Sequence, residues 1–195
     1  MITSYKQSAT TKLLFNTNPL FYNKKNFSDT ELLFKFANLL MRHGKKHKTY
    51  AILYQALHLL YIKNSRLNFM NMNKKSKYLL NLHTKNTREF LFIKLIFLQA
   101  IENVQPNVEV RNVKISGRKY QVPYIIHRKR QQFLAMRWII DCAKKRKKAS
   151  NMFFSECLSL ELFDALKKSG KVKQKRDMIH QQAESNRAYI RFKWW

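Results

Sequence analysis

Residues 108–126 read VEVRNVKISGRKYQVPYII, and they carry the clearest β signal in the chain. Two runs rich in β-branched residues, Val108 to Ile115 and Lys119 to Ile126, flank the turn-forming Ser116–Gly117–Arg118. Such runs on either side of turn residues are typical of a β-hairpin. No other segment of the sequence has strand character, so we expect a two-stranded sheet that stands alone.

Two details of this hairpin follow from the same residues. The alternation of apolar and polar residues slips between Val110 and Val113, which predicts a β-bulge. A two-stranded ribbon on its own is only marginally stable in water. Because the strands are basic, we expect a nucleic-acid surface to brace the ribbon.

The segments on both sides of the hairpin repeat apolar residues at helical spacing. The chain has only 3 glycines and 3 prolines, which favours helices over a second sheet. A capping box at Ser28 and Glu31 begins the first helix and Gly44 ends it. The other predicted helices cover residues 48–62, 86–105, 129–146, 152–168 and 176–190.

The fold class is therefore mainly α. We expect a single-domain bundle of about six helices, with a protruding two-stranded β-hairpin between the third and fourth helices. The third helix is apolar on several sides, so it should be central and should bury Phe97.

Charge gives the first indication of function. The chain has 39 lysine and arginine residues against 11 aspartate and glutamate residues, a formal net charge of +28. A compact chain of this charge repels itself and needs a dense polyanion, of which the phosphate backbone of nucleic acid is the usual one. Because 45% of the residues are hydrophobic, the chain is a folded protein and not a disordered polycation.

The basic residues gather in several clusters that border apolar helices, so the folded body should bind nucleic acid at several places. Phosphate contacts of this kind supply affinity without reading sequence. The candidate RNA-binding residues are Lys45, Lys46, Lys48, Arg111, Lys114, Arg128, Lys129, Arg130, Arg137, Lys144, Lys145, Arg146, Lys147, Lys148, Lys173, Lys175 and Arg176.

Four aromatic residues near these clusters have two possible roles. Tyr120, Tyr124, Trp138 and Tyr189 could stack on bases, or they could pack within the protein. For Trp138 we favour packing, and for Tyr120 both alternatives stay open.

The sequence shows no catalytic, metal or cofactor site. The acidic residues are scattered, and we interpret Asp177 and His180, three residues apart, as a local polar contact. The 6 histidines lack the spacing of metal ligands, and no glycine-rich phosphate loop is present. Cys142 and Cys157 lie in apolar helical patterns and should be buried, reduced thiols. The chain is predicted not to be an enzyme.

The domain organisation follows from these patterns. Residues 1–27 form an extended basic N-terminal arm, and residues 28–195 form the helical RNA-binding domain. Within that domain, residues 64–86 are a polar loop insertion and residues 107–126 are the hairpin arm. The longest apolar stretch, residues 90–101, is shorter than the roughly 20 residues that span a bilayer, so no membrane association is expected.

Five motifs in order give the chain a family resemblance from about Glu31 to the C-terminus. They are Gly44–Lys45–Lys46 with Ala51–Ile52–Leu53–Tyr54–Gln55–Ala56; Ala100–Ile101–Glu102–Asn103–Val104–Gln105–Pro106 with Val108–Glu109–Val110–Arg111; Tyr120–Gln121–Val122–Pro123; Leu134–Ala135–Met136–Arg137–Trp138; and Lys173 to Arg176 with Ala183–Glu184–Ser185–Asn186–Arg187 and Trp194. The chain resembles the family of small-subunit ribosomal protein seven. The terminal Trp194–Trp195 pair is similar to that of mitochondrially encoded members.

The resemblance implies a structural constituent of the mitochondrial small ribosomal subunit. Such a protein binds a junction in the 3′ major domain of small-subunit rRNA and nucleates assembly of the subunit head. The resemblance also implies that the hairpin lines the path of exit-site tRNA and mRNA through Ser116, Gly117, Arg118, Lys119 and Tyr120. Its protein neighbours would be small-subunit proteins nine, eleven, thirteen and nineteen, with no homo-oligomer, no cofactor and a location in the mitochondrial matrix.

The chain departs from the family pattern in three places. The insertion at residues 64–86 is longer than the family's connection, residues 1–27 match no motif, and Arg128–Lys129 stands where the family usually has Pro then Glu. One alternative of another class stays open: an architectural protein that places the hairpin arm in a DNA groove. A nuclease is a more distant alternative, because no acidic cluster is present to hold a metal.

Overall fold

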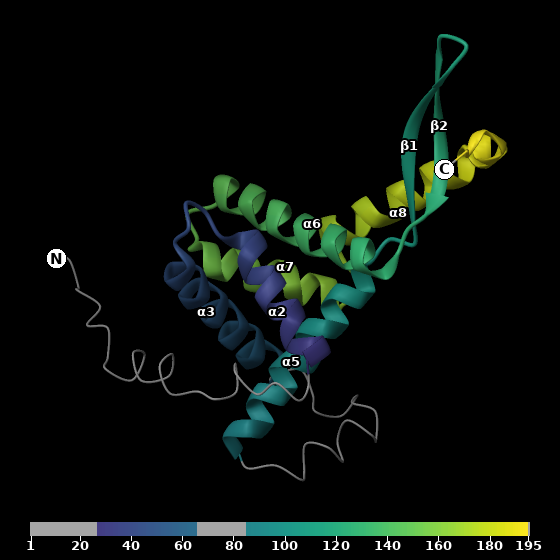
Figure 1. Ribbon diagram of the computed structural model, residues 1–195. Coiled ribbons are helices and arrows are strands. Elements are labelled where there is room, and N and C mark those ends of the chain that lie inside the picture. Colours follow the sequence, from purple (N-terminus) through teal and green to yellow (C-terminus); the bar gives the residue numbers. More distant parts are fainter. Residues whose placement is uncertain (1–26, 66–84, 195) are drawn as a thin grey trace. The chain divides into compact units, whose positions relative to one another are not determined.

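The computed structural model describes residues 27–65 and 85–194. Within these residues the chain forms α-helices, one 3-10 helix and one two-stranded antiparallel sheet, so the predicted mainly α fold with a hairpin is confirmed (Figure 1). The elements are α2 (Phe27–Leu40), α3 (Lys46–Ser65), α5 (Lys85–Val104), β1 (Val108–Ile115), β2 (Arg118–Ile125), α6 (Arg128–Ala149), α7 (Phe154–Leu166), α8 (Gly170–Ser185) and η3 (Arg187–Phe192). The predicted N-terminal arm and most of the predicted insertion lie outside the described residues.

The chain divides into two compact units at a point within α2, Met1–Lys35 and Phe36–Trp195. The described part of the first unit is helical, and the Lys35 ammonium lies 2.6 Å from the Glu31 carboxylate one turn earlier. The helix begins at Phe27, and the predicted capping box depends on the Ser28 side chain, which lies outside the described part of the structure. The rest of the described structure belongs to the second unit.

The core of the second unit forms where α7 packs against α3, α5 and α6. α5 contributes several fully buried side chains, among them Phe97, Ala100 and Val104. The Phe97 ring meets the Phe36 ring edge-on, with ring centroids 5.3 Å apart. The apolar pattern of residues 90–104 therefore identified the buried helix correctly, because a helix that is apolar on several sides packs against several neighbours.

Residues with a positive φ angle lie at two connections between helices. His43 and Gly44 have φ of 52° and 68° between α2 and α3, which agrees with the predicted turn at Gly44. Gly170, with φ of 85°, begins α8. A Cβ atom at Gly170 would lie 2.9 Å from the Asp164 Cβ atom, so the α7–α8 turn requires glycine for its conformation and for its space.

α8 differs from its predicted range at both ends. It begins at Gly170 and not at Arg176, and it ends at Ser185, after which residues 187–192 form η3. The lysine-rich run 171–176 was not recognised as helical because a single apolar residue, Val172, fixes its inner face. Val172 is buried, so the lysines around it are held on a regular helix.

The hairpin is regular along its whole length. Its strands pair without interruption from Val108 opposite Ile125 to Ile115 opposite Arg118, so the predicted bulge is wrong. Ser116 and Gly117 form a two-residue turn in which φ is positive at both positions, 48° and 81°. Turns of this kind match the twist of the strands and need no extra residue.

The slip in the apolar pattern has a simpler cause than a bulge. Arg111 and its neighbour Asn112 are both exposed, because this part of the ribbon is solvated on both faces. Where no face is buried, nothing requires apolar and polar residues to alternate.

Elements near the C-terminus pack against both strands of the ribbon. α8 packs against β1, and η3 packs against β2 (Figure 1). The Tyr120 ring lies 5.2 Å from the Tyr189 ring and 5.1 Å from the Phe192 ring, between centroids. The Gln121 side-chain oxygen accepts hydrogen bonds from Gln182 at 2.9 Å and Asn186 at 3.3 Å. Within the described residues the sheet has two strands, as expected, and the C-terminal segment of the protein itself supports it.

None of the helices in residues 27–65 and 85–194 is both long enough and apolar enough to cross a membrane.

The buried position of Phe97 leads to a stability prediction. We expect Phe97→Ala to cost about 3–5 kcal/mol of the free energy of unfolding, because it removes a fully buried ring and its edge-on contact with Phe36. Leu95→Ala, at a 36% exposed position on the same helix, is the matched control and should cost about 1 kcal/mol or less. Chemical denaturation of both variants measures the difference. Equal losses would show that α5 is not held by its Phe97 face.

Candidate nucleic-acid interface

The end of the α2–α3 connection and the first turn of α3 present three of the predicted cations. Lys45, Lys46 and Lys48 are all exposed. The loop that carries them is fixed by main-chain hydrogen bonds and by the Thr49 hydroxyl, which donates to the Lys45 carbonyl at 3.1 Å. The Lys46 ammonium lies 5.8 Å from the centre of the Tyr50 ring. The loop therefore has a fixed backbone from which mobile ammonium groups project.

The base of the hairpin gathers four residues from three elements around one carboxylate. Glu109 on β1 accepts a hydrogen bond from the Tyr124 hydroxyl on β2 at 2.6 Å. It also pairs with Arg130 at the start of α6, with the Nη2 and Oε1 atoms 3.1 Å apart. Arg111 lies over the Tyr124 ring, 4.3 Å from its centre. Of the predicted cations, Arg130 thus joins the hairpin to α6, and Arg111 packs across the two strands of the hairpin.

The surroundings of Glu109 change the acidity of its carboxyl group. Burial alone would raise the pKa of Glu109, but hydrogen bonds from Arg130 and Tyr124 and the charges of Arg130 and Arg111 outweigh it, and the pKa is lowered. For Tyr124, burial and the hydrogen bond to Glu109 raise the pKa of the phenol. At neutral pH the Glu109 carboxylate is therefore ionised, and it accepts hydrogen bonds from the neutral Tyr124 hydroxyl and the cationic Arg130 guanidinium.

The hairpin tip is exposed on all sides. Ser116, Gly117, Arg118 and Lys119 are exposed, as is Lys114 opposite Lys119. Tyr120 differs, because its ring packs on Tyr189 and Phe192 of the C-terminal segment. Of the two alternatives left open for Tyr120, the structure shows packing within the protein.

The two ends of α6 carry more of the predicted cations than any other element. Arg128 and Lys129 at its start are exposed, as are Lys145, Lys147 and Lys148 at its end. Lysines in the last turn also interact favourably with the negative end of the helix dipole. Arg137 and Lys144 flank Asp141, at 3.6 and 3.9 Å from its carboxylate.

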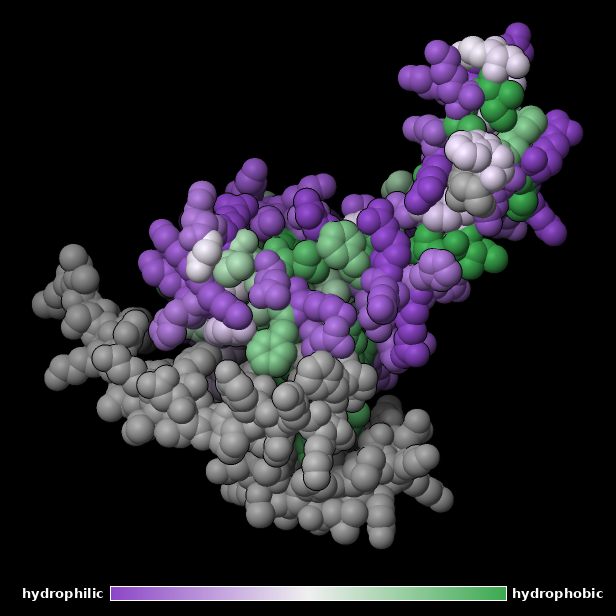
Figure 2. Space-filling view, in the orientation of Figure 1, coloured by the Kyte–Doolittle hydropathy of each residue, from purple (hydrophilic) through white to green (hydrophobic). Residues whose placement is uncertain are grey.

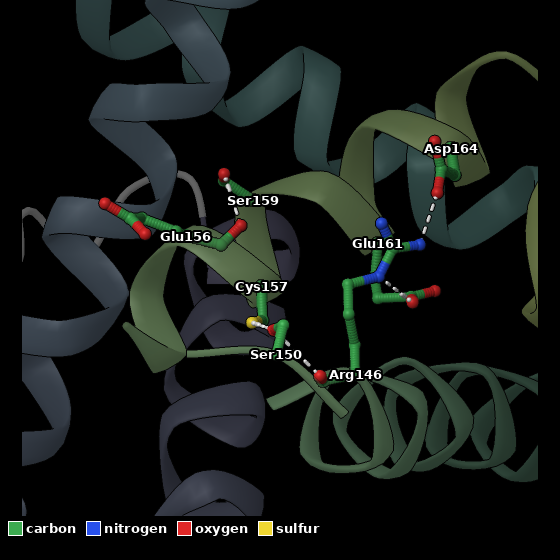
Figure 3. A network of polar contacts seen from close by, with 7 residues as sticks. All are labelled: Arg146, Ser150, Glu156, Cys157, Ser159, Glu161 and Asp164. Atoms are coloured by element: carbon green, nitrogen blue, oxygen red, sulfur yellow. Dashed lines mark hydrogen bonds and ion pairs between the residues drawn. The ribbon is translucent and has the colours of Figure 1, made fainter. Parts of the chain in front are cut away.

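Arg146, within the same basic run, has a different environment. Figure 3 shows its guanidinium reaching across to α7, where Nε donates to Glu161 and Nη2 donates to Asp164, each at 2.7 Å. Burial would lower the pKa of Arg146, but these two hydrogen bonds outweigh it and the pKa is raised. Arg146 therefore links α6 to α7.

α8 places its three predicted cations against the body of the protein. Arg176 pairs with Asp177 at 2.7 Å and also donates to the Asn103 carbonyl at the end of α5. Lys173 lies 3.9 Å from Asp177, and the Lys175 ammonium lies 5.1 Å from the centre of the Trp138 ring. Trp138 is buried, which confirms the preference for packing at that residue.

Other predicted contacts have local roles. Asp177 binds cations of its own helix, and the His180 Nε2 atom accepts the Asn107 amide hydrogen at 3.1 Å, so the two residues do not act together. Cys157 is a buried, free thiol. Cys142 is free but only partly buried, and burial followed by the charge of Glu161 raises the pKa of its thiol. In the described residues no three His, Cys, Asp or Glu side chains form a group that could hold a metal ion.

Outside α8, eleven of the predicted or tip cations are exposed and make no ion pair with a carboxylate in the part of the chain that the structure describes. Figure 2 shows the hydrophilic surface that results, in purple, over the visible face of the helices and along the hairpin. These residues are Lys45, Lys46, Lys48, Lys114, Arg118, Lys119, Arg128, Lys129, Lys145, Lys147 and Lys148. Such an arrangement suits an extended polyanion, because its phosphates can be neutralised at several separate places.

Sequence reasoning missed three exposed cations of the C-terminal segment. Arg187, Arg191 and Lys193 lie in or beside η3, which packs against β2. They therefore extend the basic surface of the hairpin. The aromatic residues at 189 and 192, spaced to cover one face of a short helix, were the available signal.

Comparison with known proteins gives one consistent result. Residues 5–187 match the family described as ribosomal protein S7p/S5e. The chain is 33% identical to the small ribosomal subunit protein uS7m of Prototheca wickerhamii, over 92% of this chain and 96% of that protein. It is 39% identical to uS7 of Buchnera aphidicola, over 85% and 88%, and 31% identical to uS7m of Arabidopsis thaliana, over 84% and 93%.

The lowered pKa of Glu109 gives a pH-dependent prediction. A carboxyl group whose folded-state pKa lies below its ordinary value of 4.5 stabilises the fold above that pH, and the contribution is lost as the pH falls through the folded-state pKa. At pH 7 we expect Glu109→Gln to cost about 1–3 kcal/mol. Below pH 4.5 the difference from wild type should shrink steadily.

Thermal melting of both proteins between pH 7 and pH 3 measures this difference. Glu102→Gln is the control, because Glu102 is an exposed glutamate on α5. A Glu109→Gln deficit that stays constant down to pH 3 would show that Glu109 is not an ionised partner of Arg130.

Proposed function

The chain belongs to the S7p/S5e family of ribosomal proteins and is therefore a structural, non-enzymatic component of the small ribosomal subunit, and we propose that it anchors a junction in the 3′ major domain of the small-subunit rRNA. By binding this junction it nucleates assembly of the subunit head. The hairpin reaches the path of exit-site tRNA and mRNA.

The observation that carries the proposal is the distribution of unpaired cations. They lie on separate elements, namely the α2–α3 loop, both ends of α6 and the hairpin strands. A single basic strip would suit one helix groove, whereas cations on several elements suit RNA helices that converge at a junction. The candidate rRNA contacts are the exposed lysines and arginines of these elements.

The cations that pair with carboxylates support the same function less directly. Arg130 fixes the start of α6 to the hairpin, and Arg176 fixes α8 to α5. Both hold the backbones of the elements that carry exposed cations. Preorganised charges bind a rigid RNA junction at a smaller cost in conformational entropy.

The proposed location is the mitochondrial ribosome. Two of the relatives carry the name uS7m, whose suffix marks the mitochondrial form. We propose as neighbours small-subunit proteins nine, eleven, thirteen and nineteen, with protein eleven across the mRNA exit.

Binding of the purified protein to an RNA fragment of the 3′ major domain tests the anchoring function. With about eight phosphate contacts, the logarithm of the affinity should fall with the logarithm of salt concentration with a slope of about −6 to −7. Duplex DNA of equal length is the competitor that represents an architectural DNA-binding protein. A slope shallower than about −2, or equal affinity for the DNA, would contradict the proposal.

A variant of the hairpin tip separates its role from that of the body. Arg118→Ser with Lys119→Ser keeps the Ser116–Gly117 turn and removes two exposed cations. We expect its affinity for the isolated rRNA junction to fall by about tenfold or less, whereas exit-site tRNA occupancy in assembled subunits should decrease. Binding assays with the rRNA fragment and with whole subunits measure the two effects.

The matched control removes two cations from the body, Lys147→Ser with Lys148→Ser. If these lysines contact rRNA, the salt slope for the junction should become shallower by about 1.5. Loss of junction binding in the hairpin variant, with normal binding in this control, would make the hairpin the anchor.

A further inference from the structure

The basic run at the end of α6 contains one residue that faces the protein. Arg146 lies among Lys144, Lys145, Lys147 and Lys148, yet its side chain is only 31% exposed and its guanidinium binds two carboxylates of α7. Figure 3 shows the Arg146 guanidinium between Glu161 and Asp164, with a dashed contact to each carboxylate. The lysines on either side at 145 and 147 are exposed.

Glu161 makes this contact important for the fold. Its side chain is 1% exposed, and within the described residues its Oε2 atom has no hydrogen-bond partner. Its Oε1 atom accepts the 2.7 Å hydrogen bond from Arg146. A buried carboxylate is tolerated when a cation compensates it, and removal of that cation is strongly destabilising.

The chemistry of the guanidinium explains why an arginine stands in a run of lysines. Glu161 and Asp164 are three residues apart, so they lie on the same face of α7. The planar fork of arginine can donate to both at once, with Nε toward one carboxylate and Nη2 toward the other. The single ammonium of lysine has no such fixed pair of donors.

The same cluster is a poor site for a phosphate. The Nε and Nη2 atoms of Arg146 already donate to Glu161 and Asp164, so they are not available to a phosphate. The last turn of α6 is also closed onto the body. The Ser150 hydroxyl donates to the Arg146 carbonyl at 2.9 Å and lies 3.8 Å from the Cys157 sulfur on α7.

We propose that Arg146 is a positioning residue and not an rRNA contact: it neutralises the buried Glu161 and thereby holds the last turn of α6, so that Lys145, Lys147 and Lys148 face the phosphates. This inference rests on the proposed function for the role of the lysines. It divides the run into one residue that binds the protein and neighbours that bind RNA.

The experiment uses the full chain and measures two quantities for each variant, the melting temperature and the salt slope for the 3′ major-domain fragment. Arg146→Met should lower the melting temperature by about 10 °C or more, because Glu161 becomes an uncompensated buried charge. Arg146→Met with Glu161→Met removes both charges and should restore most of the melting temperature. The salt slope of this double variant should equal that of wild type.

Two further variants complete the comparison. Lys147→Met should keep the wild-type melting temperature and make the salt slope shallower by about 0.7 to 0.9, the effect of one lost phosphate contact. Arg146→Lys keeps the charge but loses the fork, so its melting temperature should fall while its slope is unchanged. This second variant decides the question by melting alone if the double variant does not fold.

The outcomes separate the two roles of Arg146. A double variant whose slope is as shallow as that of Lys147→Met, or an Arg146→Lys variant that melts like wild type, would overturn the proposal and return Arg146 to the rRNA contacts. A wild-type slope near zero would contradict the proposed function itself and not only this inference.

Discussion

Thirty-nine lysine and arginine residues share one fold with 11 aspartate and glutamate residues, so negative charge is the scarce component of this protein. Without RNA, the excess of cations repels itself and opposes folding. Four of the described carboxylates bind arginines that reach between elements. Glu109 joins the hairpin to α6, Glu161 and Asp164 join α7 to α6, and Asp177 holds Arg176 beside α5.

The small number of carboxylates also explains which positions hold arginine and which hold lysine. Arg130, Arg146 and Arg176 each reach between elements, and each uses the guanidinium to bind a carboxylate while two of them also make a second contact. Most of the exposed cations without carboxylate partners are lysines, whose ammonium groups are strongly hydrated and mobile. The fold thus depends on a few arginines, and the proposed rRNA contacts depend mainly on lysines.

Much of the architecture could be predicted from the sequence, because it rests on local patterns. Apolar periodicity identified the helices, including the buried face of Phe97, and two β-branched runs identified the hairpin. The local patterns could not reveal contacts between distant residues. The ribbon was expected to stand alone because the contacts of Tyr120 with Tyr189 and Phe192 join segments about 70 residues apart. Arg146 was grouped with its neighbouring lysines because its partners lie on another helix.

The hairpin shows how these features combine. Its base is held by Glu109 and Arg130, and its β2 strand is held by the C-terminal segment through Tyr120 and Gln121. Since the Tyr120 ring is occupied by protein, contact with RNA along this arm is left to exposed cations. Phosphate contacts position a protein on RNA but read no sequence. Contacts of this kind are compatible with RNA of any sequence, which agrees with the role proposed for the hairpin.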